Sequence, residues 1–184
     1  MKLLVRKLWF KGCSIDDVMD NLFKIPQFKE LFDSYEYAGE MRPRGMKVFS
    51  CYWPADDILK RVPESKDISL VLTSMDLKGD YGRIYGRGRD RKAISSNDGF
   101  FDGYGAFCPA SVNFNATTFG EIGHALGLEH HNLDKYHPCE MSHNEWPDAE
   151  WRYLEEVRFC KDCYKQLIKN HYATLSVPIG TLIT

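Results

Sequence analysis

Hydrophobic and polar positions repeat with two periods along the chain, and these periods predict a mixture of strands and helices. Residues 2–8 alternate around Leu and Val, which predicts a strand. Residues 68–73 form a continuous apolar run with β-branched members, which is typical of a buried central strand. Further strands are predicted over 46–52, 92–96 and 99–102.

Helices are predicted where a capping residue or a proline precedes an apolar face. Ser14 is followed closely by two aspartates, so we expect it to cap a helix that runs to about Phe23. The same kinds of signal predict helices over 27–34, 54–62, 147–157 and 159–169.

Two stretches follow neither period. The glycine-rich, basic stretch 78–91 is predicted to be a solvated turn or hairpin, with an anion-binding loop as the alternative. The apolar tail 175–184 contains a proline and a glycine, and it is expected to form a last strand or to pack along the body.

Composition places the chain among ordinary single domains. It has 184 residues, of which 43% are hydrophobic and 27% charged, and this length suffices for one domain with a proper core. The net charge of −2 gives no reason to expect nucleic acid or an anionic membrane as a partner. No apolar run approaches the roughly 20 residues of a membrane span, and the first ten residues are too interrupted by charge for a signal peptide. We therefore expect a cytoplasmic protein, and a monomer.

The candidate chemistry is concentrated between residues 118 and 130. A helix is predicted over about 117–126, with Asn115 or Thr117 as its N-cap. Glu121 and His124 are three residues apart, so they share one helix face. Gly127 accepts the positive φ of a helix C-cap, and a sharp turn there would bring His130 back beside His124. Two converging imidazoles are a way to hold zinc, and a nearby carboxylate can serve as a general base toward water.

This segment resembles the long zinc-binding signature of the metzincin metalloproteases, H-E-x-x-H-x-x-G-x-x-H. The match runs through Glu121, His124, Gly127 and His130, but the first histidine of the signature falls on Gly120. Glycine has no side chain to bind a metal, so three outcomes are open. The site is inactive, Glu121 becomes a ligand instead of a base, or a third ligand comes from elsewhere.

The remaining histidines and cysteines point to one family among the metzincins. Five of the six histidines lie within residues 124–143, and clustered cysteines in a reducing compartment suggest a metal before a disulfide. The downstream order Cys-x-Met and then Phe-Cys-x-x-Cys is similar to the archaemetzincin family. That resemblance implies a second, structural zinc and four ligands for it: His131, Cys139, Cys160 and Cys163. His137 is the alternative to His131, and Cys13, Cys51 and Cys108 are expected to be buried thiols.

The resemblance also implies roles around the catalytic zinc. Met141 corresponds to the methionine of the Met-turn, beneath the metal. His143 lies two residues later, at the offset from which some metzincins of the astacin and serralysin groups extend a tyrosine to the zinc. His143 is therefore our candidate for the third ligand, beside His124 and His130.

The fold implied is α+β and metzincin-like, a twisted mixed sheet backed by helices. It is expected as one domain over 1–184, with an N-terminal subdomain, 1–130, that carries the active-site helix. A zinc-stapled C-terminal subdomain, 131–184, follows, and a strand within 92–102 is expected at the upper rim of the cleft.

Two functions follow from these residues. The first is a zinc-dependent peptidase of endopeptidase or aminopeptidase type, with Glu121 as the general base and activity impaired by Gly120. The second is a non-catalytic relative that binds peptide or protein in the cleft without cutting it. Both carry one structural zinc, and the first also needs a catalytic zinc.

Overall fold

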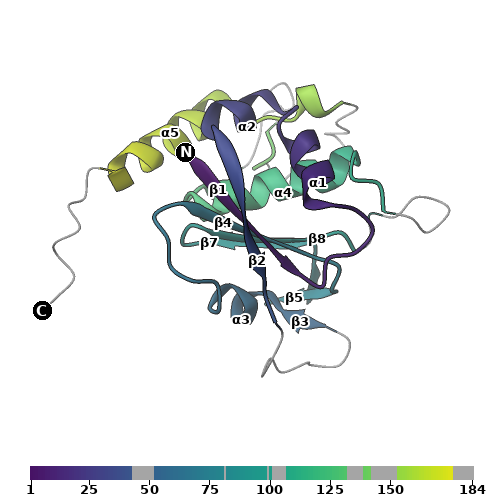
Figure 1. Ribbon diagram of the computed structural model, residues 1–184. Coiled ribbons are helices and arrows are strands. Elements are labelled where there is room, and N and C mark those ends of the chain that lie inside the picture. The colour runs from purple at the N-terminus through teal and green to yellow at the C-terminus, as the bar shows by residue number, and fades with distance from the viewer. Residues whose placement is uncertain are drawn as a thin grey trace, which may run out of the picture.

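A computed structural model describes residues 1–42, 52–80, 82–98, 100, 107–131, 139–141 and 153–175, with the backbone alone over 171–175. A five-stranded sheet runs through the middle of the molecule in the order β2-β1-β4-β8-β7, and a three-stranded sheet, β3-β5-β6, lies below it (Figure 1). The strands of the large sheet are β1 (Lys2–Leu8), β2 (Ser34–Glu40), β4 (Ile68–Thr73), β7 (Gly86–Arg89) and β8 (Lys92–Ser96). Those of the small sheet are β3 (Trp53–Pro54), β5 (Leu77–Gly79) and β6 (Gly82–Ile84).

The large sheet is mixed because one edge strand runs against the others. β1, β2, β4 and β8 pair in parallel, whereas β7 pairs antiparallel with β8. Asp90 and Arg91 connect β7 to β8 with φ of 49° and 62°, the left-handed conformation of a tight primed hairpin turn. This hairpin makes β7 an edge strand of the described sheet.

Helices cover both faces of the large sheet, and each face has its own core. Above the sheet in Figure 1 lie α1 (Ile15–Leu22), α2 (Pro26–Leu31), α4 (Val112–Ala125) and α5 (Lys161–Leu175), and α3 (Ala55–Leu59) lies below it. Within β4, Leu70 and Leu72 belong to the upper core, and Val71 belongs to the lower one. This alternation of neighbouring side chains between opposite faces buries all of β4.

The C-terminal residues pack tightly onto the upper layer. Phe159 stacks on Phe119 of α4 with ring centroids 4.3 Å apart. The backbone N–H of Phe159 donates to the side-chain carbonyl of Gln27 at 2.7 Å, and the Gln27 amide donates back to the Phe159 carbonyl at 3.2 Å. These contacts fix the segment that leads into α5 against α2 and α4.

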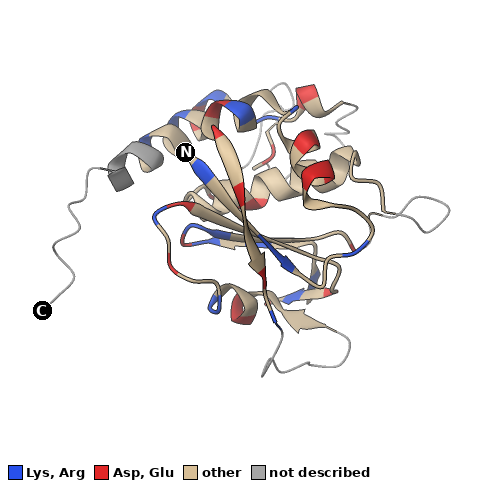
Figure 2. Ribbon diagram, viewed as in Figure 1, with Lys and Arg blue, Asp and Glu red and all other residues tan. Residues whose placement is uncertain are grey.

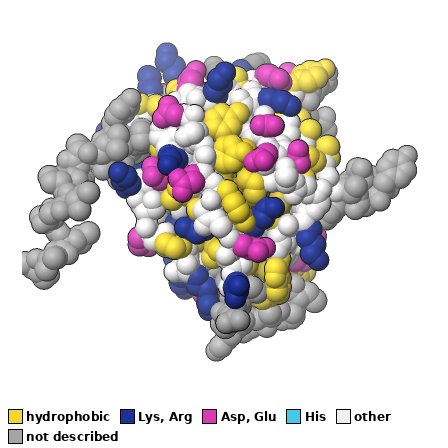
Figure 3. Space-filling view, in the orientation of Figure 1, with side chains coloured by type: hydrophobic (Ala, Val, Ile, Leu, Met, Phe, Trp, Pro, Cys, Tyr) yellow, Lys and Arg dark blue, Asp and Glu magenta, His cyan; other side chains and the backbone are white. Residues whose placement is uncertain are grey.

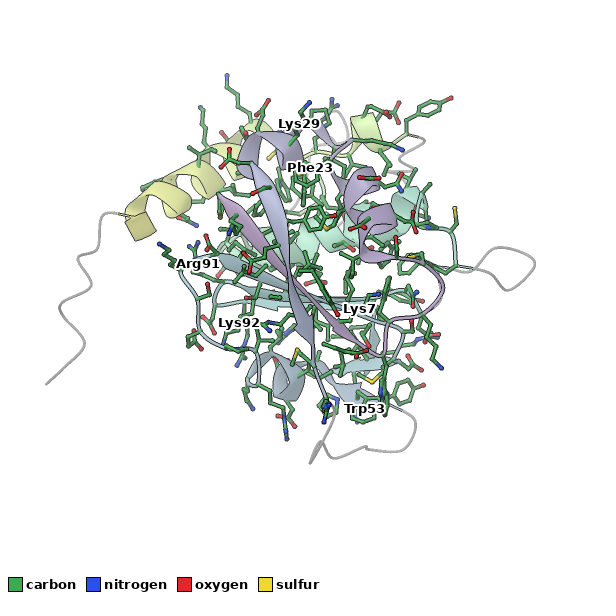
Figure 4. The ribbon with its side chains drawn as sticks, viewed as in Figure 1. Lys7, Phe23, Lys29, Trp53, Arg91 and Lys92 are labelled. Atoms are coloured by element: carbon green, nitrogen blue, oxygen red, sulfur yellow. The ribbon has the colours of Figure 1, made fainter. Side chains whose placement is uncertain are left out.

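Charges of both signs are distributed over helices and strands (Figure 2). The face that carries β2 shows apolar side chains between charged ones (Figure 3). Arg91 and Lys92 lie together where β8 begins, far from Trp53 at the lower edge (Figure 4). In the described part of the chain, no helix combines the length and apolar character needed to span a bilayer.

Several predicted elements are confirmed. The α+β class, the strands 2–8 and 92–96, and the central strand 68–73 are as expected. Stretch 78–91 forms strands and hairpins, as expected, and Ser14 caps α1. Ser14 accepts from the Asp17 N–H through Oγ at 3.0 Å, and its own N–H donates to the Asp17 carboxylate at 3.0 Å.

Other predicted boundaries and elements were wrong. Strand β2 occupies 34–40, where no strand was predicted, and the preceding helix ends at Leu31. Pro54 is the N-cap of α3 and not a residue within it, and α3 ends at Leu59. Residues 154–156 form one 3₁₀ turn within the range 147–157 predicted as helix. A strand within 92–102 was expected at the rim. The part of it that the structure describes as a strand, β8, lies inside the sheet, and β7 is the edge strand beside the motif helix. The strands predicted over 46–52 and 99–102 and the tail lie largely outside the described residues.

Candidate metal centres

Helix α4 positions the candidate catalytic residues. It begins earlier than predicted because Ser111 is its N-cap, with Oγ accepting from the Phe114 N–H at 3.3 Å. Asn115, a predicted cap, is buried inside the helix, and its amide donates to the carbonyls of Pro109 and Ser111 at 2.8 Å. Glu121 and His124 lie on this one helix, as predicted.

The end of α4 turns the chain back as the sequence predicts. Gly127 has a φ of 83°, and its N–H donates to the His124 carbonyl at 2.9 Å. The N–H of Leu128 donates to the Gly123 carbonyl at 3.0 Å, which completes a Schellman motif. Two further carbonyls at this end accept from distant residues, Ala125 from the Arg91 N–H at 2.9 Å and Leu126 from the Asn170 amide at 2.8 Å.

The turn brings His130 beside His124 in an edge-on arrangement, with ring centroids 4.6 Å apart. Their Nε2 atoms are 3.1 Å apart. Each Nδ1 faces a backbone carbonyl, that of Leu128 at 2.9 Å for His124 and that of Met141 at 3.3 Å for His130. A ring nitrogen next to a carbonyl carries the proton, so two Nε2 lone pairs meet and must share a proton or a cation.

The geometry of this pair fits a metal. Two nitrogens on one tetrahedral zinc, each bound at about 2.0–2.1 Å, lie about 3.3 Å apart. Backbone carbonyls that hold Nδ1 are the usual means of orienting a metal-binding imidazole. His124 is half-buried and His130 exposed, so an ion can reach the pair from solvent. Two side chains alone do not complete a zinc site.

Glu121 lies beneath the edge strand β7. A Cβ at Gly86 would lie 2.5 Å from Cγ of Glu121, and a Cβ at Gly88 would lie 1.8 Å from its carbonyl oxygen. Glycine at both positions therefore lets the backbone of β7 lie directly on α4. Burial raises the pKa of Glu121 to about 8, with the Glu140 carboxylate adding to the rise and Arg87 opposing it.

The arginines of β7 face the other way. Arg87 pairs with Asp56 at 3.5 Å and Asp80 at 3.2 Å, and Arg89 pairs with Asp56 at 3.3 Å. The alternation Gly-Arg-Gly-Arg thus places small residues against the motif helix and cations against α3. Neither arginine needs an external anion to balance its charge.

A second group of donors lies on the C-terminal side of His130. The ligand atoms of His131, Cys139, Cys160 and Cys163 all lie within 4.8 Å of one another. Nε2 of His131 is 3.6 Å from Sγ of Cys160. These four residues come from three separate segments of the chain. Three cysteines and one histidine are a common ligand set for a structural zinc.

The start of α5 favours the charged form of one thiol in this group. Burial alone would raise the pKa of Cys160, but the backbone N–H groups of Cys163 and Asp162 and the neighbouring thiols outweigh it, and the pKa is lowered. Burial raises the pKa of Cys139 and of Cys163. A thiolate beside thiols is a ready metal ligand because the metal displaces the remaining protons.

Met141 joins the two groups. Its side chain is fully buried, and a Cβ at Gly123 would lie 3.1 Å from its sulfur. Its carbonyl accepts from the His131 N–H at 3.0 Å and also faces Nδ1 of His130. Met141 therefore lies against the motif helix beside the histidine pair, where the predicted Met-turn would place it.

Some predicted residues are placed differently or not at all. His143, His137 and Cys51 lie outside the described residues. Cys108 is exposed and Cys13 only partly buried, against the prediction of buried thiols. The neighbour Phe107 packs into the core against Phe114, and Cys108 is turned outward. Glu140 could not be found from the sequence, because nothing in the spacing of Cys-x-Met marks the middle residue.

Comparisons with known proteins agree on the fold. The sequence matches no protein-family profile and no curated protein. The structure is similar to that of an archaemetzincin from Methanopyrus kandleri, with a TM-score of 0.65 and 21% identity over 92% of this chain and 94% of that one. It is also similar to an archaemetzincin from Archaeoglobus fulgidus solved with malonate (TM-score 0.63, 18% identity, 90% and 99% covered). A zinc-dependent peptidase from Methanocorpusculum labreanum gives a TM-score of 0.60 at 18% identity, with 89% and 99% covered. The chain therefore has an archaemetzincin-like fold.

Proposed function

We propose that this chain is a zinc-dependent metallopeptidase of the archaemetzincin family that hydrolyses peptide bonds, with activity reduced because position 120 is a glycine. The observation that carries the proposal is the pair His124 and His130, with both Nδ1 atoms held by carbonyls and both Nε2 atoms 3.1 Å apart. The likeness of the fold to zinc peptidases supports it.

A few residues of the proposed site would bind the metal, act as the general base and contact the peptide. A zinc ion held by His124 and His130, with His143 as the predicted further ligand, would polarise a substrate carbonyl and acidify water. Glu121, one helical turn before His124, accepts the proton of the attacking water and donates it to the leaving amine. Among the described strands β7 is an edge, so its outward backbone groups are available to an extended peptide.

The four-donor group is proposed to hold a structural zinc. His131, Cys139, Cys160 and Cys163 join three segments of the C-terminal part, and such a metal contributes directly to folding free energy. The proposal thus includes two zinc ions. Thiolate ligands persist in a reducing compartment, so a cytoplasmic location is included, as is a monomer that light scattering would test.

A peptide-cleavage assay tests the proposal. The zinc-loaded protein is incubated with a mixture of quenched fluorescent peptides, and Glu121→Ala is expected to abolish cleavage because the base is lost. Glu155→Ala is the matched control, since Glu155 is exposed on the 3₁₀ turn and should leave the rate unchanged. Equal rates in wild type and Glu121→Ala would reject the proposed mechanism.

A non-catalytic peptide-binding protein is the second candidate, and Gly120 favours it. The described histidine pair is one ligand short of a complete site. Saturable peptide binding by the zinc-loaded protein, without cleavage of any peptide in the mixture, would replace the first proposal by this one.

A further inference from the structure

Gly120 leaves a space one helical turn before His124, and another side chain already occupies it. A Cβ built on Gly120 would lie 3.1 Å from Cγ and 3.4 Å from Oε1 of Glu140. The carboxyl group of Glu140 thus rests where a side chain of residue 120 would begin. Gly120 is buried in α4, and Glu140 is half-buried.

The backbone of Glu140 is fixed from both sides. Its N–H donates to the Arg158 carbonyl at 2.9 Å. Cys139, on one side, belongs to the four-donor group, and Met141, on the other, presents its carbonyl to Nδ1 of His130. The backbone of Glu140 is therefore fixed between the two candidate metal centres.

The reach and the chemistry of this side chain suit a ligand. Cβ atoms four residues apart on a helix lie about 5–6 Å apart, so a carboxylate that rests on Gly120 lies on the same face of α4 as His124, one turn away. Two imidazoles and one glutamate are a donor set of catalytic zinc, with a fourth position left open. The Glu140 carboxylate would then take the place of the histidine that is absent at position 120.

We propose that Glu140 supplies the third protein ligand to the metal held by His124 and His130, in place of a histidine at position 120. This inference rests on the proposed function, because it assumes a metal at the histidine pair. It differs from the prediction for His143, in which a residue two positions after Met141 would supply the third ligand.

Measurements of zinc binding test directly whether Glu140 is a ligand, and they do not depend on peptidase activity. Wild type, Glu140→Ala and Glu140→Gln are loaded with zinc, and zinc per chain and the dissociation constant of the weaker ion are determined. We expect two zinc ions in wild type and a loss of affinity for the weaker ion by more than about 100-fold in both variants, since even outer-shell partners cost 10–100-fold. Glu140→Gln keeps the size of the side chain and covers the case in which Glu140→Ala folds poorly.

Two controls separate ligand loss from damage to the fold. Cobalt(II) bound to the four-donor group gives a thiolate charge-transfer absorption, which should be unchanged in the Glu140 variants. Gly120→His combined with Glu140→Ala should restore the second ion, because the imidazole then takes the space that the carboxylate leaves.

The outcomes are distinguishable. Two zinc ions bound with wild-type affinity in both Glu140 variants would overturn the role of Glu140 and leave the proposed function standing. The same result together with loss of the second ion in His143→Ala would assign the ligand to His143. A single zinc in wild type would overturn both this inference and the proposed catalytic site.

Discussion

The two candidate metal centres are adjacent in the chain, since His130 belongs to one and His131 to the other, yet they differ in completeness. Four donors converge within 4.8 Å in the group of His131, Cys139, Cys160 and Cys163. At the other centre two imidazoles meet at 3.1 Å, and the third donor of the metzincin pattern is missing. The complete centre joins distant segments, whereas the incomplete one includes the exposed His130 and has the half-buried Glu121 one helical turn before His124.

This difference indicates a division between stability and chemistry. A tetrahedral site closed by four side chains leaves no position for a substrate, so it serves the fold. An open site needs a vacant position and a base, and it tolerates a change of ligand at a cost in affinity. Substitutions should therefore act on stability at the first centre and on metal affinity or activity at the second.

The largest effect is expected at the complete centre. Cys160→Ser removes a thiolate and should lower the free energy of unfolding by more than about 4 kcal/mol, the range typical of losing a structural metal, or prevent soluble expression. Thermal melting measures it. Cys108→Ser is the matched control, because this exposed thiol should change stability by no more than about 0.5 kcal/mol. Equal melting temperatures for the two variants would remove the distinction between the centres.

The next effect concerns the seat of β7 on the motif helix. Gly88→Ala places a Cβ 1.8 Å from the Glu121 carbonyl oxygen, so strand or helix must move. Overpacking of this kind should cost about 3 kcal/mol or more in chemical denaturation. Gly120→Ala is the comparison: its Cβ would come no closer than 3.1 Å to the Glu140 side chain, so its effect on stability should be far smaller. A Gly88→Ala protein as stable as Gly120→Ala would show that β7 does not lie where the structure places it.

At the incomplete centre a restored ligand should increase function. Gly120→His in the Glu140→Ala background puts an imidazole one turn before His124, and we expect zinc affinity at this centre and peptidase activity to exceed those of Glu140→Ala by about 10–100-fold, in the range of a lost metal contact. The thermal stability of the protein without zinc at this centre should change little. If Gly120→His binds no second zinc and cleaves no peptide while the fold is intact, the binding-protein function would be the better account.

The smallest effect is expected at the N-cap of α1, far from both centres, and it serves as a reference for the larger effects. Ser14→Ala removes the N-cap of α1 and should cost roughly 0.5–2 kcal/mol near neutral pH. Hydrogen bonds from the Ser14 side chain and backbone lower the pKa of Asp17, so the ionised form is favoured in the folded state. That contribution is present above the unfolded pKa of Asp17 and is lost as pH falls through the lower folded value. Stability curves against pH for wild type and Ser14→Ala should therefore converge in acid; a constant difference would contradict the capping box.

How far the sequence predicts this molecule depends on how local each signal is. Gly127 and the histidine spacing predict the turn and the convergence of His124 and His130, because a Schellman motif is set by a few consecutive residues. Strand β2 was missed because its sequence, SYEYAGE, is polar and half-exposed at the edge of the sheet, so no buried face marks it. The start of α4 was missed because Ser111 and Asn115 are both good caps, and only burial decides between them.

The candidate site shows the same limit. All four donors of the complete centre, His131 among them, could be predicted from cysteine spacing and a family resemblance. Glu140 could not, because its approach to Gly120 depends on how residues 139–141 are held between Arg158, His130 and His131. The need for glycine at positions 86 and 88 can be understood only once β7 is known to lie on α4.

The number of zinc ions bound per chain distinguishes two metal centres from one. Wild-type protein is saturated with zinc, freed of loosely bound ion by gel filtration and measured by elemental analysis against an amino-acid count. The two-centre account predicts two ions in wild type and one in the double variant His124→Ala, His130→Ala, with the thiolate-rich centre still filled. One ion in both proteins, with the fold intact, would contradict the existence of a metal at the histidine pair.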